Sequence, residues 1–163
     1  MIRNRLLLLT ALLFFLPLAA QAQTGVYGEF SGAGLGVGDK VYGGTFGLYS
    51  DAIHAAVVSL GFDVRGEFLT GNGQSLNSGL GGLRLAAHPQ VLPLKPYVEA
   101  LGGVGHADTV LGSSTHAEYR IAGGVDWTIF PRIDWRVVEV SGGDSTGNVS
   151  PTVISTGIVL RLP

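Results

Sequence analysis

The sequence predicts an all-β protein, an eight-stranded antiparallel up-and-down transmembrane β-barrel that is preceded by a cleavable signal peptide. Three observations lead to this prediction. The chain of 163 residues begins with a short apolar segment that ends in small residues. The remainder shows no helical periodicity but eight segments of alternating apolar and polar residues. In these segments the charged residues fall on one face and the large apolar residues on the other.

The N-terminal segment predicts a signal peptide over residues 1–22. Arg3 and Arg5 form a basic start, residues 6–18 are mostly apolar, and residues 20–22 have the small-residue pattern of a cleavage site. A retained membrane helix is the alternative, but the apolar run is shorter than the roughly 20 residues that a spanning helix needs. We therefore expect residues 23–163 to form the mature protein, a single β-barrel domain.

The eight alternating segments are separated by turn-rich sequence. They are residues 24–36, 41–50, 57–69, 78–87, 96–107, 117–130, 134–142 and 152–162. The connections after the second, fourth and sixth segments contain Pro or His, whereas the other connections are mostly small, polar and rich in Gly, Asn and Ser. An up-and-down order places the two sets at opposite ends, as expected for a membrane barrel with two different ends.

Residues 59–68, SLGFDVRGEF, illustrate how the two faces divide. Phe62 and Val64 share one face, and Asp63 lies on the other. The polar faces of the segments also include Glu118 and Glu139. We expect these faces to form a charge network in the lumen that consists of Glu29, Asp63, Arg65, Glu67, Arg84, Glu99, Arg120, Asp126 and Arg161.

The same alternation would suit a soluble, lipocalin-like barrel with its apolar face inward. A soluble exterior is normally rich in lysine and glutamate, but this chain has only Lys40 and Lys95 as lysines. Arginine is the residue suited to buried, bidentate pairing with carboxylates. A charge on a lipid face would cost about 2–4 kcal/mol at mid-depth. We therefore predict apolar side chains toward lipid and a narrow lumen plugged by paired charges.

Composition excludes some classes of function. The formal net charge is −2, which gives no reason to expect a nucleic-acid partner. The chain contains no cysteine, so disulfides do not stabilise it. No motif for a cofactor is present, since the glycine-rich residues 32–40 lack the spacing of a phosphate-binding loop.

Several aromatic residues lie toward the ends of the predicted strands. They are Tyr27, Tyr42, Tyr49, Tyr97, Trp127, Phe130 and Trp135. This placement predicts two aromatic girdles at the membrane interfaces, although ordinary strand propensity would also explain it.

The last segment, STGIVLRL, is similar to the terminal assembly signal of bacterial outer-membrane barrels, with Ser155, Gly157, Leu160 and Leu162 in the matching places. With the signal peptide and the alternating segments, the mature chain resembles the OmpA-like/OmpX-like eight-stranded outer-membrane β-barrel superfamily. In that superfamily the final position is usually aromatic, whereas here Leu162 is followed by Pro163. The resemblance implies insertion into the bacterial outer membrane by the barrel-assembly machinery. We expect a monomer there that contacts lipid and lipopolysaccharide.

The pattern favours a structural, adhesive or envelope-integrity role without a cofactor. A lipid A-modifying enzyme is an alternative, because Ser113, Ser114, His106, His116 and Glu118 cluster in sequence near one connection. The two histidines are also a weak candidate for a metal pair. A narrow solute or ion pore is a further alternative, which pairing of the lumen charges disfavours.

Overall fold

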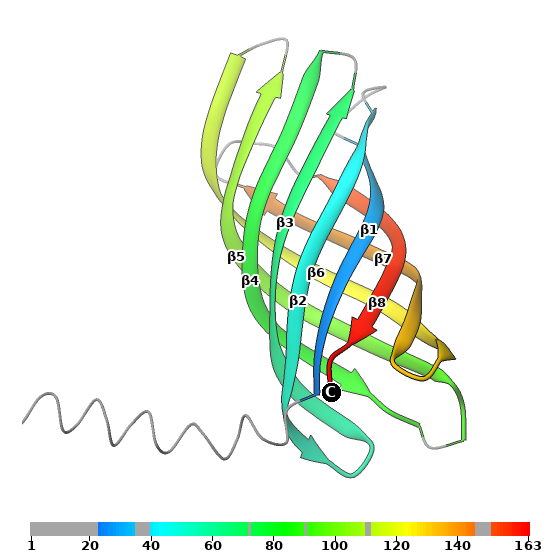
Figure 1. Cartoon of the computed structure of the whole chain (residues 1–163). Helices are drawn as coiled ribbons and strands as arrows, with labels where there is room; N and C mark the ends of the chain where they lie inside the picture. The colour runs from blue at the N-terminus through cyan, green and yellow to red at the C-terminus, as the bar shows by residue number, and fades with distance from the viewer. Residues whose placement is uncertain (1–22, 35–39, 72, 90, 110–111, 146–150) are drawn as a thin grey trace, which may run out of the picture.

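Eight antiparallel strands close into one barrel in the computed structural model (Figure 1). The structure describes residues 23–34, 40–71, 73–89, 91–109, 112–145 and 151–163, so the predicted signal peptide lies outside the described residues. The strands are β1 (Gln23–Gly34), β2 (Lys40–Ala55), β3 (Val58–Gly71), β4 (Gln74–Ala87), β5 (Leu94–Thr109), β6 (Gly112–Phe130), β7 (Ile133–Ser145) and β8 (Thr152–Arg161). Each strand pairs with the next, and β1 pairs with β8, which confirms the predicted fold class. Among the described residues, no helix is long and apolar enough to span a membrane.

The two ends of the barrel differ, and we name them by their connections. The even end holds the connections after β2, β4 and β6, the start of β1 and the end of β8, and the odd end holds the other connections (Figure 1). Residues 51–56, 70–77 and 108–115 fall between the predicted segments, but most of them belong to strands. Backbone pairing continues almost to the turns, as in Gly71 with Gln74, although the side-chain alternation fades there.

Inward and outward residues alternate along the strands, and the outward ones are apolar. On β3, Phe62 and Val64 are more than half exposed, whereas Asp63 and Arg65 are at most 5% exposed. The barrel therefore carries its apolar residues on the outside. Such an exterior is the one that lipid solvates best.

The girdle prediction is wrong for three tyrosines, because Tyr27, Tyr49 and Tyr97 are buried in the lumen. Inward-facing glycines leave room for these rings. A Cβ at Gly25 would lie 2.5 Å from the ring of Tyr49, and one at Gly124 would lie 2.6 Å from that of Tyr97. Glycine at these positions thus allows an aromatic ring to fill the narrow interior.

The other four predicted girdle residues keep an outward position. Tyr42, Trp127, Phe130 and Trp135 are each at least 39% exposed. Tyr42 lies near the odd end of β2, and the remaining three lie near the even end. These four fit the predicted placement toward the barrel ends.

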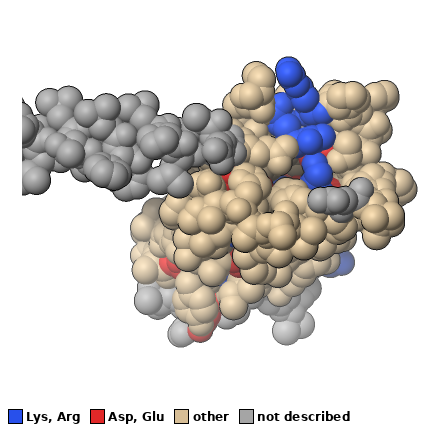
Figure 2. Space-filling view, turned by 90° about the horizontal axis from the view of Figure 1, so that it is seen from below, with Lys and Arg blue, Asp and Glu red and all other residues tan. Residues whose placement is uncertain are grey.

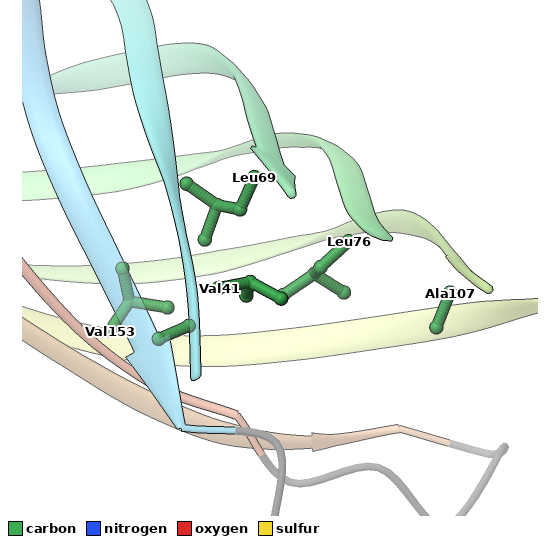
Figure 3. Packing of buried hydrophobic residues seen from close by; sticks show 6 residues of the cluster. Val41, Leu69, Leu76, Ala107 and Val153 are labelled. Atoms are coloured by element: carbon green, nitrogen blue, oxygen red, sulfur yellow. The ribbon is translucent and has the colours of Figure 1, made fainter. Parts of the chain in front are cut away.

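An apolar cluster occupies the lumen near the odd end. Its side chains come from the odd-end parts of six strands and approach one another across the interior (Figure 3). The cluster, which we call the apolar cap, consists of Ala33, Val41, Leu69, Leu76, Ala107 and Val153. The lumen is therefore ionic over part of its length and apolar at one end.

Candidate functional site: the ion-paired lumen

Three arginines and three carboxylates form a closed ring of alternating charge across the lumen. In ring order they are Arg65, Glu99, Arg84, Asp126, Arg136 and Glu139. They come from β3, β4, β5, β6 and β7, so the ring ties five strands together. We call these six residues the charge ring.

Each arginine of the charge ring contacts at least two carboxylates. Arg84 donates to Glu99 at 2.5 Å and to Asp126 at 3.2 Å. The Nε of Arg136 donates to Asp126 at 2.9 Å, and its Nη1 donates to Glu139 at 3.2 Å. Because every guanidinium has two or more anionic partners, its charge is compensated without water.

Arg65 and two further acids complete the pairing around the ring. Arg65 donates to Glu99 and Glu139, and its Nε donates to Asp63 at 2.9 Å. Arg136 also donates to Glu29, at 2.5 Å. Asp63 and Glu29 are not members of the charge ring. When they are counted with it, carboxylates outnumber guanidinium groups, so the formal charge is negative.

The lumenal tyrosines pack against the guanidinium groups. The Arg84 guanidinium lies 3.8 Å from the ring centroid of Tyr97, and the Arg136 guanidinium lies 4.3 Å from that of Tyr27. The Tyr27 hydroxyl donates to Asp63 at 2.9 Å, and the Tyr97 hydroxyl donates to Glu139 at 2.6 Å. Tyr27 and Tyr97 thus each contribute a cation–π contact and a hydrogen bond to the same network.

A second ionic cluster lies between the charge ring and the apolar cap. Arg120 donates two hydrogen bonds of 2.9 Å to Glu67 and a third to Glu118. Ser78 donates to Glu118 at 2.9 Å. Close by, His116 is buried, and neither of its ring nitrogens has a hydrogen-bond partner among the described residues.

Basic side chains gather at the even end, where Figure 2 shows them as a stripe. Buried Asp134 pairs with Lys95 at 2.9 Å and with Arg161 at 3.1 Å. The backbone N–H of Arg161 donates to the carbonyl of Arg132, so the exposed residue Arg132 lies near these pairs. Asp134 therefore neutralises only part of a basic mouth.

The structure gathers the nine predicted lumen residues inside the barrel or at its mouth. Eight of the nine are at most 5% exposed, and Arg161 is partly exposed at the even end. Sequence reasoning missed Arg136, Asp51 and Asp134. A register shift between Arg136 and Glu139 explains the first omission, because the extra residue in β7 turns both side chains inward although they are three positions apart.

The residues considered for catalysis separate onto two sides of the barrel wall. His116 and Glu118 are buried in the lumen, whereas half-buried His106 on β5 and exposed Ser113 on β6 face outward. The candidate metal pair of His106 and His116 is therefore wrong. Within the described ranges, no group of three or more His, Cys, Asp or Glu residues is arranged to hold a metal ion.

His106 instead belongs to an exposed hydrogen-bonded cluster near the odd end. Its Nδ1 lies 2.8 Å from the Thr115 hydroxyl, and its Nε2 lies 3.2 Å from the Ser113 hydroxyl and 3.4 Å from an Asp108 oxygen. Asp108 lies near the odd end of β5, beyond the apolar outward residues of that strand, and hydrogen bonds from Ser113 and Ser75 lower its pKa. A catalytic triad needs the nucleophile and the acid on different ring nitrogens. Among the described contacts of His106, only Thr115 with Asp108 meets this condition.

The residues of the predicted assembly signal alternate between the two faces of β8. Ser155 is buried and its hydroxyl lies 2.8 Å from that of Ser31. A Cβ at Gly157 would lie 2.6 Å from the Cα of Glu29, so β1 and β8 approach closely there. Leu160 and Leu162 are exposed on the outside.

The closed strand order, apolar exterior and ionic interior define an eight-stranded transmembrane β-barrel, and these features place the chain in the bacterial outer membrane. No protein-family model matches the sequence, and a search of curated proteins gives no match.

Solved structures show which proteins share this fold. Neisserial surface protein A (NspA), from Neisseria, aligns over 86% of this chain and 97% of its own, with a TM-score of 0.59 and 17% identity. The N-terminal β-barrel domain of Pseudomonas aeruginosa OprF covers 87% and 100%, with a TM-score of 0.53 and 14% identity. Ail, the attachment invasion locus protein of Yersinia pestis, covers 86% and 97%, with a TM-score of 0.56 and 8% identity. At the level of fold, these similarities confirm the predicted resemblance to OmpA-like and OmpX-like barrels.

Proposed function

We propose that this protein is a closed, non-conducting outer-membrane barrel with a structural or envelope-integrity role. The observation that carries the proposal is the charge ring, in which every arginine is bound by at least two carboxylates. An eight-stranded barrel has an interior just wide enough for side chains. An ion crossing this interior would have to break buried pairs, which is costly.

The apolar cap supports the same proposal from the odd end. It leaves an ion without polar partners at that level of the lumen, and transfer of a charge into apolar surroundings is strongly unfavourable. The barrel is then closed twice, by paired charges and by packed aliphatic side chains. This arrangement favours a structural role over the narrow pore.

An adhesive role is the less supported variant of this proposal. NspA is by its name a surface protein, and Ail is an attachment invasion locus protein. In this chain, however, β3 and β4 are only two residues apart, as are β5 and β6. Such short tips offer little surface to a large receptor. We also propose that the barrel is a monomer inserted by the assembly machinery, with the even end toward the periplasm.

Deletion of the protein tests the envelope-integrity role. We expect deletion cells to become more sensitive to detergents and large hydrophobic antibiotics, and we expect expression of the wild-type chain to restore resistance. Unchanged sensitivity would contradict the role. Slower uptake of small hydrophilic solutes, with an intact barrier, would favour the pore instead.

The exposed cluster at His106 supports a second candidate function, a lipid A hydrolase. In this mechanism His106 would take a proton from Thr115 through Nδ1, while Asp108 would orient the imidazole through Nε2. Mass profiles of lipid A from cells with and without the protein test it. The hydrolase requires a shortened acyl pattern that His106→Ala abolishes and His54→Ala, at the opposite end, leaves intact.

A further inference from the structure

A groove of about 440 Å³ lies on the outer face where β7, β8, β1 and β2 adjoin. Its floor includes Gly32 and Gly34, which face outward on β1. Gly34 pairs in register with Lys40 on β2 and Thr152 on β8, and Gly32 pairs with Tyr42 and Ile154. At Gly34 the floor has no side chain, whereas the ring of Tyr42 lies over Gly32, where a Cβ would be 3.0 Å from the ring.

The floor of the groove is open above Gly34. A Cβ added there would meet no atom of the described residues within 4 Å. Farther down, the rings of Phe30 and Tyr42 stack with centroids 6.3 Å apart. On β7, the bulge between Arg136 and Glu139 interrupts pairing with β8 beside Val138, which also lines the groove. Apolar surface without close packing is the usual composition of a ligand site.

The charge at the groove identifies its occupant. Lys40 lines the odd-end part of the groove and is exposed. The only other lysine, Lys95, lies at the even end. A lysine at a membrane surface attracts an anionic headgroup, while the apolar surface below it suits an acyl chain.

We infer that this groove binds one acyl chain of an anionic, phosphate-bearing membrane lipid, whose headgroup pairs with Lys40. The inference depends on the barrel lying in a membrane and not on its proposed role in the envelope. A failed lipid test would therefore leave the closed lumen untouched, and a conducting lumen would leave the lipid site untouched.

Tryptophan fluorescence can report the bound chain. Trp135 donates to the hydroxyl of Thr156, a lining residue, at 3.2 Å, so its indole lies beside the inner part of the groove. Trp127 is the only other tryptophan, and Trp127→Phe leaves a single reporter. The full mature chain would be folded in nanodiscs of phosphatidylcholine that contain either brominated phosphatidylglycerol or brominated phosphatidylcholine.

We expect brominated phosphatidylglycerol to quench Trp135 at about one fifth of the mole fraction that brominated phosphatidylcholine needs, since one lysine at a membrane surface contributes about 1 kcal/mol. Lys40→Gln should remove this preference without filling the groove. Gly34→Leu should remove most of the selective quenching by filling it. Gly79→Leu is the matched control, because Gly79 is exposed on β4 and a Cβ there also meets no atom within 4 Å.

Several outcomes would overturn the lipid site. Equal quenching by the two lipids in the wild-type background, or a preference that persists in Lys40→Gln, would exclude an anionic lipid at this groove. Equal quenching in Gly34→Leu and Gly79→Leu would show that the groove is not the site. A dimer in the nanodisc that Gly34→Leu dissociates would assign the groove to a second copy of the chain.

Discussion

On β3, neighbouring side chains occupy two contrasting environments. Phe62 and Val64 are outward and largely exposed, while Asp63 and Arg65 are inward and buried. The outer face relies on being uniformly apolar, so any apolar residue of suitable size can serve there. The inner face relies on specific pairs, because each buried charge needs a partner in a fixed place. The two faces therefore tolerate substitution for different reasons.

Removal of one arginine from the charge ring should have the largest effect. Arg136→Met leaves Asp126, Glu29 and Glu139 without a common partner. We expect a loss of about 3–5 kcal/mol in the free energy of unfolding, since breaking a buried pair strands its partners. Denaturant unfolding in detergent micelles measures this loss. Arg132→Met, at an exposed turn, is the control and should change stability by less than about 0.5 kcal/mol.

A charge on the outer face should have the next largest effect. Val64→Arg places a guanidinium in lipid near the middle of β3, and we expect a cost of about 2–4 kcal/mol. The fraction that folds into liposomes, measured by heat-modifiable migration on a gel, should fall. Val91→Arg, in the exposed connection between β4 and β5, should fold like the wild type. Similar folding yields for the two variants would mean that β3 does not face lipid.

Smaller changes test the space inside the lumen. Gly25→Ala puts a methyl group 2.5 Å from the ring of Tyr49, and such overpacking costs about 1–3 kcal/mol. Most of this cost should vanish in a Tyr49→Leu background, as a double-mutant cycle would show. Gly79→Ala meets no neighbouring atom and serves as the control. If Gly25→Ala and Gly79→Ala unfolded alike, the tyrosine would not occupy the space above Gly25.

The exposed cluster at the odd end predicts the smallest effect, a change with pH. Hydrogen bonds from Ser113 and Ser75 lower the pKa of Asp108 from its ordinary value of 3.8. The contribution of Asp108 to folding is therefore complete above pH 3.8, and it is lost as the pH falls through the lowered value. An NMR titration of the Asp108 carboxyl carbon measures this pKa. A midpoint at or above 3.8 would contradict the cluster.

The sequence was sufficient to predict the strand number, the up-and-down order and the inversion of faces, because alternation repeats over eight segments. It was insufficient wherever local geometry breaks that alternation. Arg136 was missed because of the bulge in β7. The position of Tyr27 near a strand end predicts a place in a girdle. The sequence does not show that a glycine on the neighbouring strand leaves room for its ring inside the lumen. The contacts of His106 were equally hidden, since they depend on pairing between β5 and β6.

We propose that paired charges and an apolar cap close the lumen. Planar-bilayer recording of the folded, full mature chain in molar potassium chloride tests this claim most directly. The charge ring and the cap predict a silent bilayer, without conductance steps at any applied voltage that the membrane withstands. Reproducible unit steps from the wild-type chain would show that ions pass the ring, and they would contradict the claim.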